Sequence, residues 1–122
     1  MKLAHTMLRV SDPEKVIDFY REAFGFEVRR KSENDSFTLY FLKIPGQEAE
    51  LELTYNHGKD DKYEKGEGFG HIAIRTEEAQ SVREAYEKAV EAGGEDYRPP
   101  EKCPGKYGFV KDPEGYEVEI LG

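Results

Sequence analysis

The 122-residue sequence has a single cysteine, Cys103, and no apolar stretch close to the roughly 20 residues that a membrane-spanning helix needs. One cysteine cannot close a disulfide within the chain, which suits a reducing compartment. No histidine lies near Cys103 in sequence, so we expect a surface loop thiol rather than a catalytic one. The first residues contain one lysine and no apolar core, unlike a signal peptide. These absences predict a cytoplasmic protein with no membrane partner.

Basic residues are also in deficit, since 18 Lys and Arg stand against 26 Asp and Glu and leave a formal net charge of −8. This charge repels phosphate backbones, and no basic stripe interleaved with aromatic residues is present, so we expect no nucleic-acid partner. A chain of this length can bury one core without disulfides. We therefore expect a single domain over residues 1–122.

The sequence does contain an internal repeat. The segment His5-Thr6-Met7-Leu8-Arg9-Val10 returns 66 residues later (71 − 5) as His71-Ile72-Ala73-Ile74-Arg75-Thr76. Both copies read His-x-x-x-Arg within a strand pattern, and each leads into a helix pattern. The repeat predicts two copies of one structural unit.

Each copy has its own helix signals. In the first, Asp12 can cap the helix, Pro13 fits its first position and Gly25 ends it. In the second, we expect Thr76 as the cap and Gly93-Gly94 as the end. Apolar residues at helical spacing form the core stripes: Val16, Ile17, Tyr20 and Phe24 in the first helix, and Val82, Ala85, Tyr86, Ala89 and Val90 in the second.

Strand-like segments follow each helix. They cover residues 27–31, 37–42 and 49–55 in the first copy, and 96–98, 107–110 and 116–121 in the second. The predicted fold class is α+β, with two tandem βαβββ modules, about 1–56 and 70–122, that form mixed curved sheets with flanking helices. A polar, Gly-rich linker from Asn56 to Gly70 joins the modules.

Strand alternation places one histidine and one glutamate of each module on the sheet face away from its helix, His5 with Glu52 and His71 with Glu119. The spacings agree, at 47 residues (52 − 5) and 48 residues (119 − 71). A single strand histidine is usually a satisfied core residue, but the same pair repeated at matching depth indicates a shared site. Two imidazoles and two carboxylates suit a divalent transition metal with positions left open for water or substrate. The third histidine, His57, has no counterpart, and we expect it to be exposed or to line the mouth of the site.

These features resemble glyoxalase I within the vicinal oxygen chelate superfamily. The motifs that carry the resemblance follow the family's order along nearly the whole chain: residues 5–10, Phe19-Tyr20, Glu52-Leu53-Thr54-Tyr55-Asn56, Gly70-His71-Ile72-Ala73 and residues 112–119. By this resemblance, the family's four metal ligands fall on His5, Glu52, His71 and Glu119. Arg9 and Asn56 match positions that contact the glutathione part of the substrate.

The resemblance implies a lyase that isomerises the hemithioacetal of methylglyoxal and glutathione, or another thiol, to S-D-lactoylglutathione. Glu119 would be the principal base and Glu52 its partner. His5 stands where eukaryotic members carry glutamine and resembles the bacterial group that works with nickel or cobalt, with zinc also possible. In the family each site lies between two subunits, so we expect a homodimer with its sites at the subunit interface.

Two departures concern the thiol. Glu67 stands where eukaryotic members have an arginine and would repel a glutathione carboxylate, and His57 stands where many members have tryptophan. Other metal-dependent relatives remain alternatives, namely an epimerase, a thiol transferase or an extradiol dioxygenase. The last uses two histidines and one glutamate with iron and leaves Glu52 unexplained. A metal-free drug-binding module is a further alternative, which four ligands on one face argue against.

Overall fold

The computed structural model describes residues 1–77, 79–103 and 106–122. The first module contains β1 (His5–Arg9), α1 (Pro13–Phe24), β2 (Glu27–Glu33), β3 (Phe37–Lys43) and β4 (Glu50–Asn56). The second contains β5 (His71–Arg75), α2 (Val82–Glu91), β6 (Glu95–Arg98), the short 3₁₀ helix η1 (Pro100–Lys102), β7 (Tyr107–Lys111) and β8 (Glu117–Leu121). None of the helices in these described ranges has the length and apolar character to cross a membrane.

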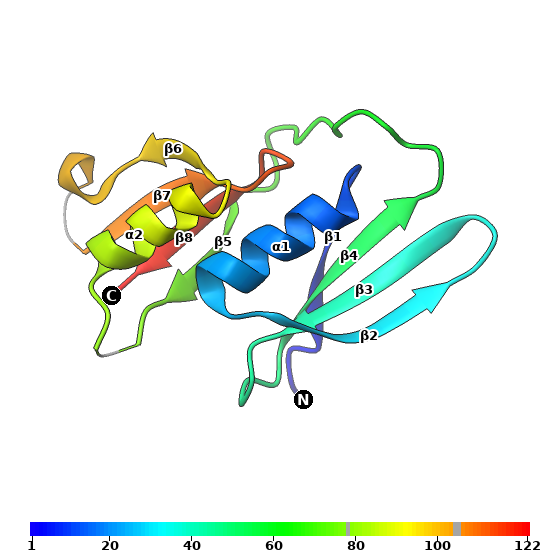
Figure 1. Ribbon diagram of the computed structural model, residues 1–122, viewed down its shortest axis with the longest axis horizontal. Coiled ribbons are helices and arrows are strands. Elements are labelled where there is room, and N and C mark those ends of the chain that lie inside the picture. The colour runs from blue at the N-terminus through cyan, green and yellow to red at the C-terminus, as the bar shows by residue number, and fades with distance from the viewer. Residues whose placement is uncertain (78, 104–105) are drawn as a thin grey trace.

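The two modules form separate sheets of four strands with the same topology. The first sheet has the order β1-β4-β3-β2 and the second has the order β5-β8-β7-β6. In each, the first strand pairs in parallel with the last and the remaining pairs are antiparallel. Figure 1 shows the sheets on either side of α1, which occupies the middle of the molecule. The predicted pair of βαβββ modules with mixed sheets is therefore confirmed.

The signals predicted for α1 are confirmed. The Asp12 side chain accepts a hydrogen bond from the Lys15 backbone N–H, and Pro13 opens the helix. Gly25 ends it in the left-handed conformation, with φ 78°, which a residue with a Cβ adopts only at a cost.

The predicted cap of the second helix is wrong, because α2 begins at Val82 and its N-cap is Ser81 rather than Thr76. Ser81 and Glu84 form a capping box in which each side chain accepts from the other residue's backbone N–H. This pair satisfies two of the free N–H groups at the helix start, one more than a single threonine side chain can satisfy.

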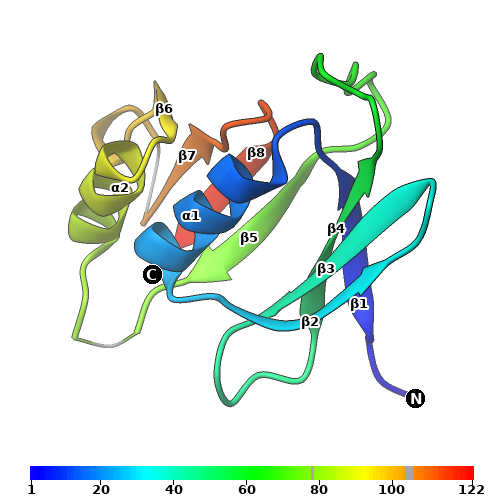
Figure 2. The ribbon, with the colours of Figure 1, turned by 45° about the vertical axis from the view of Figure 1, so that its right-hand side comes forward.

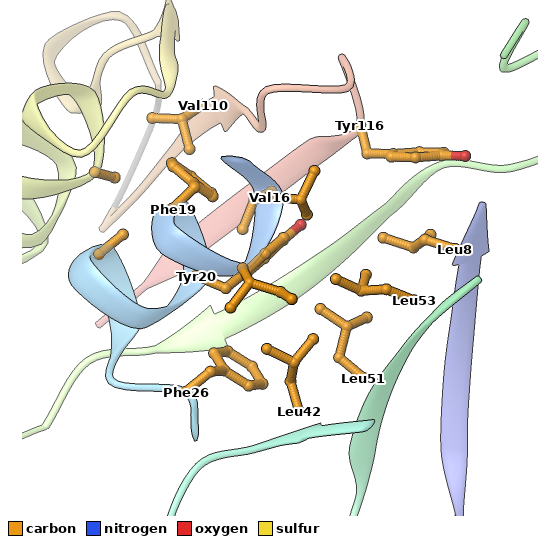
Figure 3. Close-up of a cluster of buried hydrophobic side chains, with 14 of the residues drawn as sticks. Leu8, Val16, Phe19, Tyr20, Phe26, Leu42, Leu51, Leu53, Val110 and Tyr116 are labelled. Carbon is orange, nitrogen blue, oxygen red and sulfur yellow. The ribbon is translucent and has the colours of Figure 1, made fainter. Parts of the chain in front are cut away.

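The helices and the inner sheet faces share one core. Leu8, Leu51 and Leu53 of the first module and Val110, Val118 and Ile120 of the second belong to the same buried cluster. Phe19 and Tyr20 of α1 lie at its centre (Figure 3). Since this side of each sheet is covered by helix, the other side, which carries the predicted metal ligands, is left open.

Buried polar contacts fix α1 against the turn between β7 and β8. The Glu114 carboxylate, 2% exposed, accepts from the backbone N–H groups of Ser11 and Asp12 at 2.9 and 3.0 Å and from the Ser11 hydroxyl. A negative group is favourable at this position because it faces the positive end of the helix dipole. The Tyr20 hydroxyl donates to Asp112 at 2.7 Å. The pKa of Tyr20 is raised, mainly because the side chain is buried and secondly because the Asp112 carboxylate is close to it. These contacts hold the two modules in one arrangement within the chain.

Candidate metal centre

The first module brings His5 and Glu52 together from two parallel strands. Met7 of β1 pairs with Glu52 of β4, so His5 lies two residues away along β1 on the same face. His5 Nε2 is 3.9 Å from Glu52 Oε1. The His5 side chain is 43% exposed and the Glu52 side chain 12%, which leaves the imidazole open to a ligand while the carboxylate is largely sheltered.

The second module repeats this arrangement. Ala73 of β5 pairs with Glu119 of β8, and His71 Nε2 is 3.7 Å from Glu119 Oε2. The side-chain exposures of 40% for His71 and 17% for Glu119 match those of the first pair. The sequence repeat therefore corresponds to a repeated geometry. Each of the two His–Glu pairs is called a half-site below.

The donor set of each half-site fits a transition metal. Imidazole nitrogen and carboxylate oxygen bind zinc-like ions at about 2.0–2.2 Å, so one ion can span up to about 4.2 Å between two donor atoms. The gaps of 3.9 and 3.7 Å lie within that span and are too long for a hydrogen bond. Neither pair is therefore hydrogen-bonded, and both consist of residue types that could bind a transition metal.

One chain does not bring the two half-sites together. Across residues 1–77, 79–103 and 106–122, no three His, Cys, Asp or Glu side chains gather closely enough to hold an ion. The half-sites lie on different sheets, and Figure 2 shows β5 between β8 and the first sheet, with β1 at the far side of the molecule. The four predicted ligands therefore do not form a single cluster within the part of one chain that the structure describes.

Sequence reasoning missed one aromatic residue in each half-site. Phe41 of β3 lies directly across from Glu52, and its ring meets the His5 ring edge to face with centroids 6.0 Å apart. Phe109 of β7 lies across from Glu119 and meets His71 in the same way at 5.1 Å. The signal was available, since the two phenylalanines are 68 residues apart (109 − 41), close to the offset of the histidines. The rings restrict the orientation of both imidazoles.

The predicted thiol-contacting residues lie at one end of the first sheet. Arg9 pairs with Thr54, and Asn56 is the next residue of β4 on the same face. At about 3.3 Å per residue, both are roughly 13 Å along their strands from the predicted ligands. The Arg9 side chain is exposed, while the Asn56 carboxamide nitrogen donates to the Tyr63 hydroxyl at 3.0 Å.

The three residues without an assigned role lie outside the strands that carry the predicted ligands. His57 is exposed as expected, and its ring contacts the Thr38 hydroxyl at 2.8 Å and the Asp35 carbonyl oxygen at 3.2 Å. These contacts attach it to the hairpin between β2 and β3. Glu67 is exposed within the linker, and Cys103 is half-buried in the loop after η1.

Comparisons with known proteins agree with the fold. The model of the Glyoxalase/Bleomycin resistance protein/Dioxygenase superfamily matches residues 2–120, and the chain belongs to this family. The lactoylglutathione lyase of Escherichia coli O157:H7 is 44% identical, with 99% of this chain and 92% of that protein aligned. The lactoylglutathione lyase of Haemophilus influenzae is 42% identical over the same shares.

Solved glyoxalase I structures resemble the whole chain. The trypanothione-dependent enzyme of Leishmania major superimposes with a TM-score of 0.83 at 36% identity, covering 100% of this chain and 86% of that one. Glyoxalase I of Zea mays gives a TM-score of 0.85 at 35% identity, covering 98% of this chain and 44% of that one. The family's two-module fold is therefore shared from end to end.

Proposed function

We propose that the chain catalyses the glyoxalase I reaction, converting the hemithioacetal of methylglyoxal and glutathione into S-D-lactoylglutathione. The repeated His–Glu pair, at the same strand register and nearly the same spacing in both modules, carries this proposal. The chain is an enzyme of the lactoylglutathione lyase type, in line with its 44% identity to the Escherichia coli relative over nearly the full length of both. A single cysteine fits a cytoplasmic setting.

The metal would be held by two nitrogen and two oxygen ligands, His5, Glu52, His71 and Glu119. No thiolate takes part, so the set suits nickel, cobalt or zinc, and we favour nickel or cobalt because a histidine rather than a glutamine occupies position 5. When bound, the ion supplies Lewis-acid stabilisation of the negative charge that develops on the substrate oxygens.

The protein's own groups move the proton. The reaction removes a proton from a carbon beside a carbonyl and returns it to the neighbouring carbon, which suits a carboxylate that acts first as base and then as acid. We assign Glu119 as the principal base and Glu52 as its partner on the opposite side of the substrate. Both carboxylates are sheltered, at 17% and 12% exposure, which limits competition from water. Arg9 would hold the anionic end of the thiol, with Asn56 beside it.

We further propose that modules 1–56 and 70–122 are halves of one domain that acts as a homodimer. Each active site would combine the first module of one chain with the second module of its partner. This assembly is supported by the open face on each sheet and by the separation of the half-sites within the chain.

The test is thioester formation from methylglyoxal and glutathione by metal-stripped protein reconstituted with nickel, cobalt or zinc. Restored turnover with nickel or cobalt, and weaker turnover with zinc, is expected. Stoichiometric metal binding without turnover would reject glutathione as the thiol and retain the metal centre. Failure to bind any of the three ions would reject the centre itself.

A further inference from the structure

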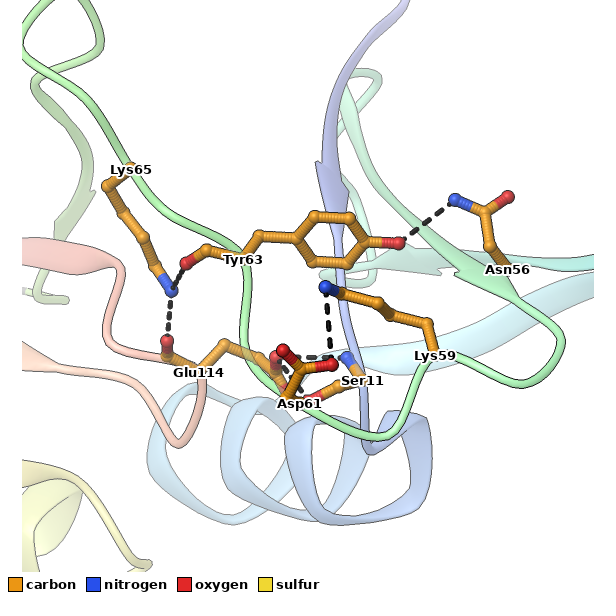
Figure 4. A network of polar contacts seen from close by, with 7 residues as sticks. All are labelled: Ser11, Asn56, Lys59, Asp61, Tyr63, Lys65 and Glu114. Carbon is orange, nitrogen blue, oxygen red and sulfur yellow. Dashed lines mark hydrogen bonds and ion pairs between the residues drawn. The ribbon is translucent and has the colours of Figure 1, made fainter.

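The linker between the modules places a tyrosine against Asn56. Tyr63 is half-buried, and its hydroxyl oxygen accepts a hydrogen bond from Asn56 Nδ2 at 3.0 Å. Figure 4 shows the Asn56 carboxamide oxygen on the side away from Tyr63. A carboxamide on a strand end rotates easily about its last torsion, so a fixed partner is needed to hold one orientation.

Tyr63 is itself fixed by the second module. The Lys65 ammonium donates to the Tyr63 carbonyl oxygen at 2.8 Å and to the Glu114 carbonyl oxygen in the turn after β7. The same ammonium lies 4.7 Å from the centre of the Tyr116 ring. The linker is therefore attached to the turn between β7 and β8, which contains the buried Glu114, rather than free in solvent (Figure 4).

A second lysine holds the tyrosine ring. Lys59 Nζ lies 4.6 Å from the ring centre of Tyr63 and 3.3 Å from Asp61 Oδ1. A cation over an aromatic face is attracted by the negative face of the ring. Backbone contact and ring contact together leave the Tyr63 hydroxyl little freedom to move away from Asn56.

We propose that Tyr63 is a positioning residue for thiol recognition, which holds Asn56 with its carboxamide oxygen turned toward the ligand. This inference rests on the proposed function and adds a residue to it. An outward oxygen accepts a hydrogen bond, so the thiol substrate would donate one at this position while Arg9 binds a negative group.

The experiment compares Tyr63→Phe, Asn56→Ala, Asn56→Asp and the double variant Tyr63→Phe/Asn56→Ala with the wild type. The matched control is Tyr40→Phe, since Tyr40 also lies beneath a lysine, at 5.6 Å from Lys31 Nζ, but on the opposite face of the sheet. KM and kcat for the glutathione hemithioacetal are measured with nickel-loaded protein. The side-chain amide signals of Asn56 are followed in parallel by NMR.

Loss of Tyr63 should raise KM about 3- to 10-fold, the equivalent of one hydrogen bond, and leave kcat and metal affinity unchanged. The Tyr63→Phe effect should vanish when Asn56 is already alanine, because the tyrosine acts through that side chain. In high salt, which screens repulsion between the new carboxylate and the anionic end of the thiol, Asn56→Asp should bind better than Asn56→Ala, since a carboxylate still accepts from the ligand.

Three results would overturn the proposal. An equal KM increase from Tyr63→Phe in the Asn56→Ala background would show a general structural effect. Weaker binding by Asn56→Asp than by Asn56→Ala in high salt would show that the ligand accepts rather than donates at this position. Unchanged Asn56 side-chain amide signals in Tyr63→Phe would show that the two side chains are not in contact, and this result does not depend on whether the protein is active. Absence of wild-type turnover with every metal would instead refute the proposed function, and the substrate role of Tyr63 with it.

Discussion

Glu52→Gln damages the half-site of the first module, and Glu119→Gln damages the half-site of the second. In the proposed dimer each active site takes one half from each chain, so either variant alone has two damaged sites. A mixed dimer of the two variants differs. One of its sites combines both damaged halves, and the other combines the intact first module of one chain with the intact second module of its partner.

The expected recovery follows from this pairing. Random reassociation of equal amounts makes half of the dimers mixed, and each mixed dimer has one intact site of two, so activity should reach about a quarter of the wild-type value. The separate variants should both be nearly inactive. Thioester formation is measured after the chains are unfolded together, refolded and loaded with metal, with the dimer composition read by native mass spectrometry.

A matched control uses His5→Ala mixed with Glu52→Gln. Both changes fall in the first module, so every site of their mixed dimer keeps one damaged half and no activity should return. Recovery in this control would refute the pairing of first and second modules. Confirmed mixed dimers of Glu52→Gln and Glu119→Gln without recovery would show that each site is completed within one chain.

Three other perturbations test separate parts of the structure. Arg9→Ala should raise KM for the glutathione adduct roughly tenfold or more with kcat preserved, whereas a loss confined to kcat would contradict a binding role. Glu114→Gln should lower the free energy of unfolding in urea by about 1–3 kcal/mol, because a buried acceptor for two backbone N–H groups is replaced by a partly donating amide. Since the pKa of Tyr20 is raised in the folded state, the unfolded chain loses that proton first, and stability should fall as pH rises above the ordinary tyrosine pKa of 10.0. Tyr20→Phe should make this alkaline loss shallower across a urea series at increasing pH, and an unchanged slope would exclude Tyr20 as a source.

The sequence predicted the parts of the fold that depend on local chemistry. Strand alternation and residue type placed His5 with Glu52 on an open face, and the structure brings their donor atoms within 3.9 Å. The start of α2 was mispredicted because two residues, Thr76 and Ser81, can both act as caps. The Glu84 side chain, which accepts a hydrogen bond from the Ser81 backbone N–H, favours Ser81 as the cap. Choosing the first polar residue after the strand as the cap ignores this second hydrogen bond.

Contacts between distant segments were outside the reach of pattern reasoning. Glu114 belongs to a turn motif, and nothing in that motif indicates that its carboxylate binds Ser11, 103 residues away. Tyr63 lies in the polar, Gly-rich linker, where no motif indicates a role for it, yet Lys65 fixes it to the second module. Such roles depend on which surfaces the folded modules bring together, and sequence spacing does not contain that information.

These long-range contacts also fix the arrangement in which the half-sites lie apart within one chain. A rearrangement that moved α1 away from the turn between β7 and β8 would break them. Glu114, at 2% exposure, would then lose the N–H groups of Ser11 and Asp12, and Asp112, at 3% exposure, would lose the Tyr20 hydroxyl. Each unsatisfied buried polar group costs about 1–3 kcal/mol. Association with a second chain can cover the same faces without breaking any of these bonds. The polar contacts that stabilise the single chain are therefore compatible with the proposal that a partner chain completes the metal centre, and under that proposal assembly of the dimer would be a condition for catalysis.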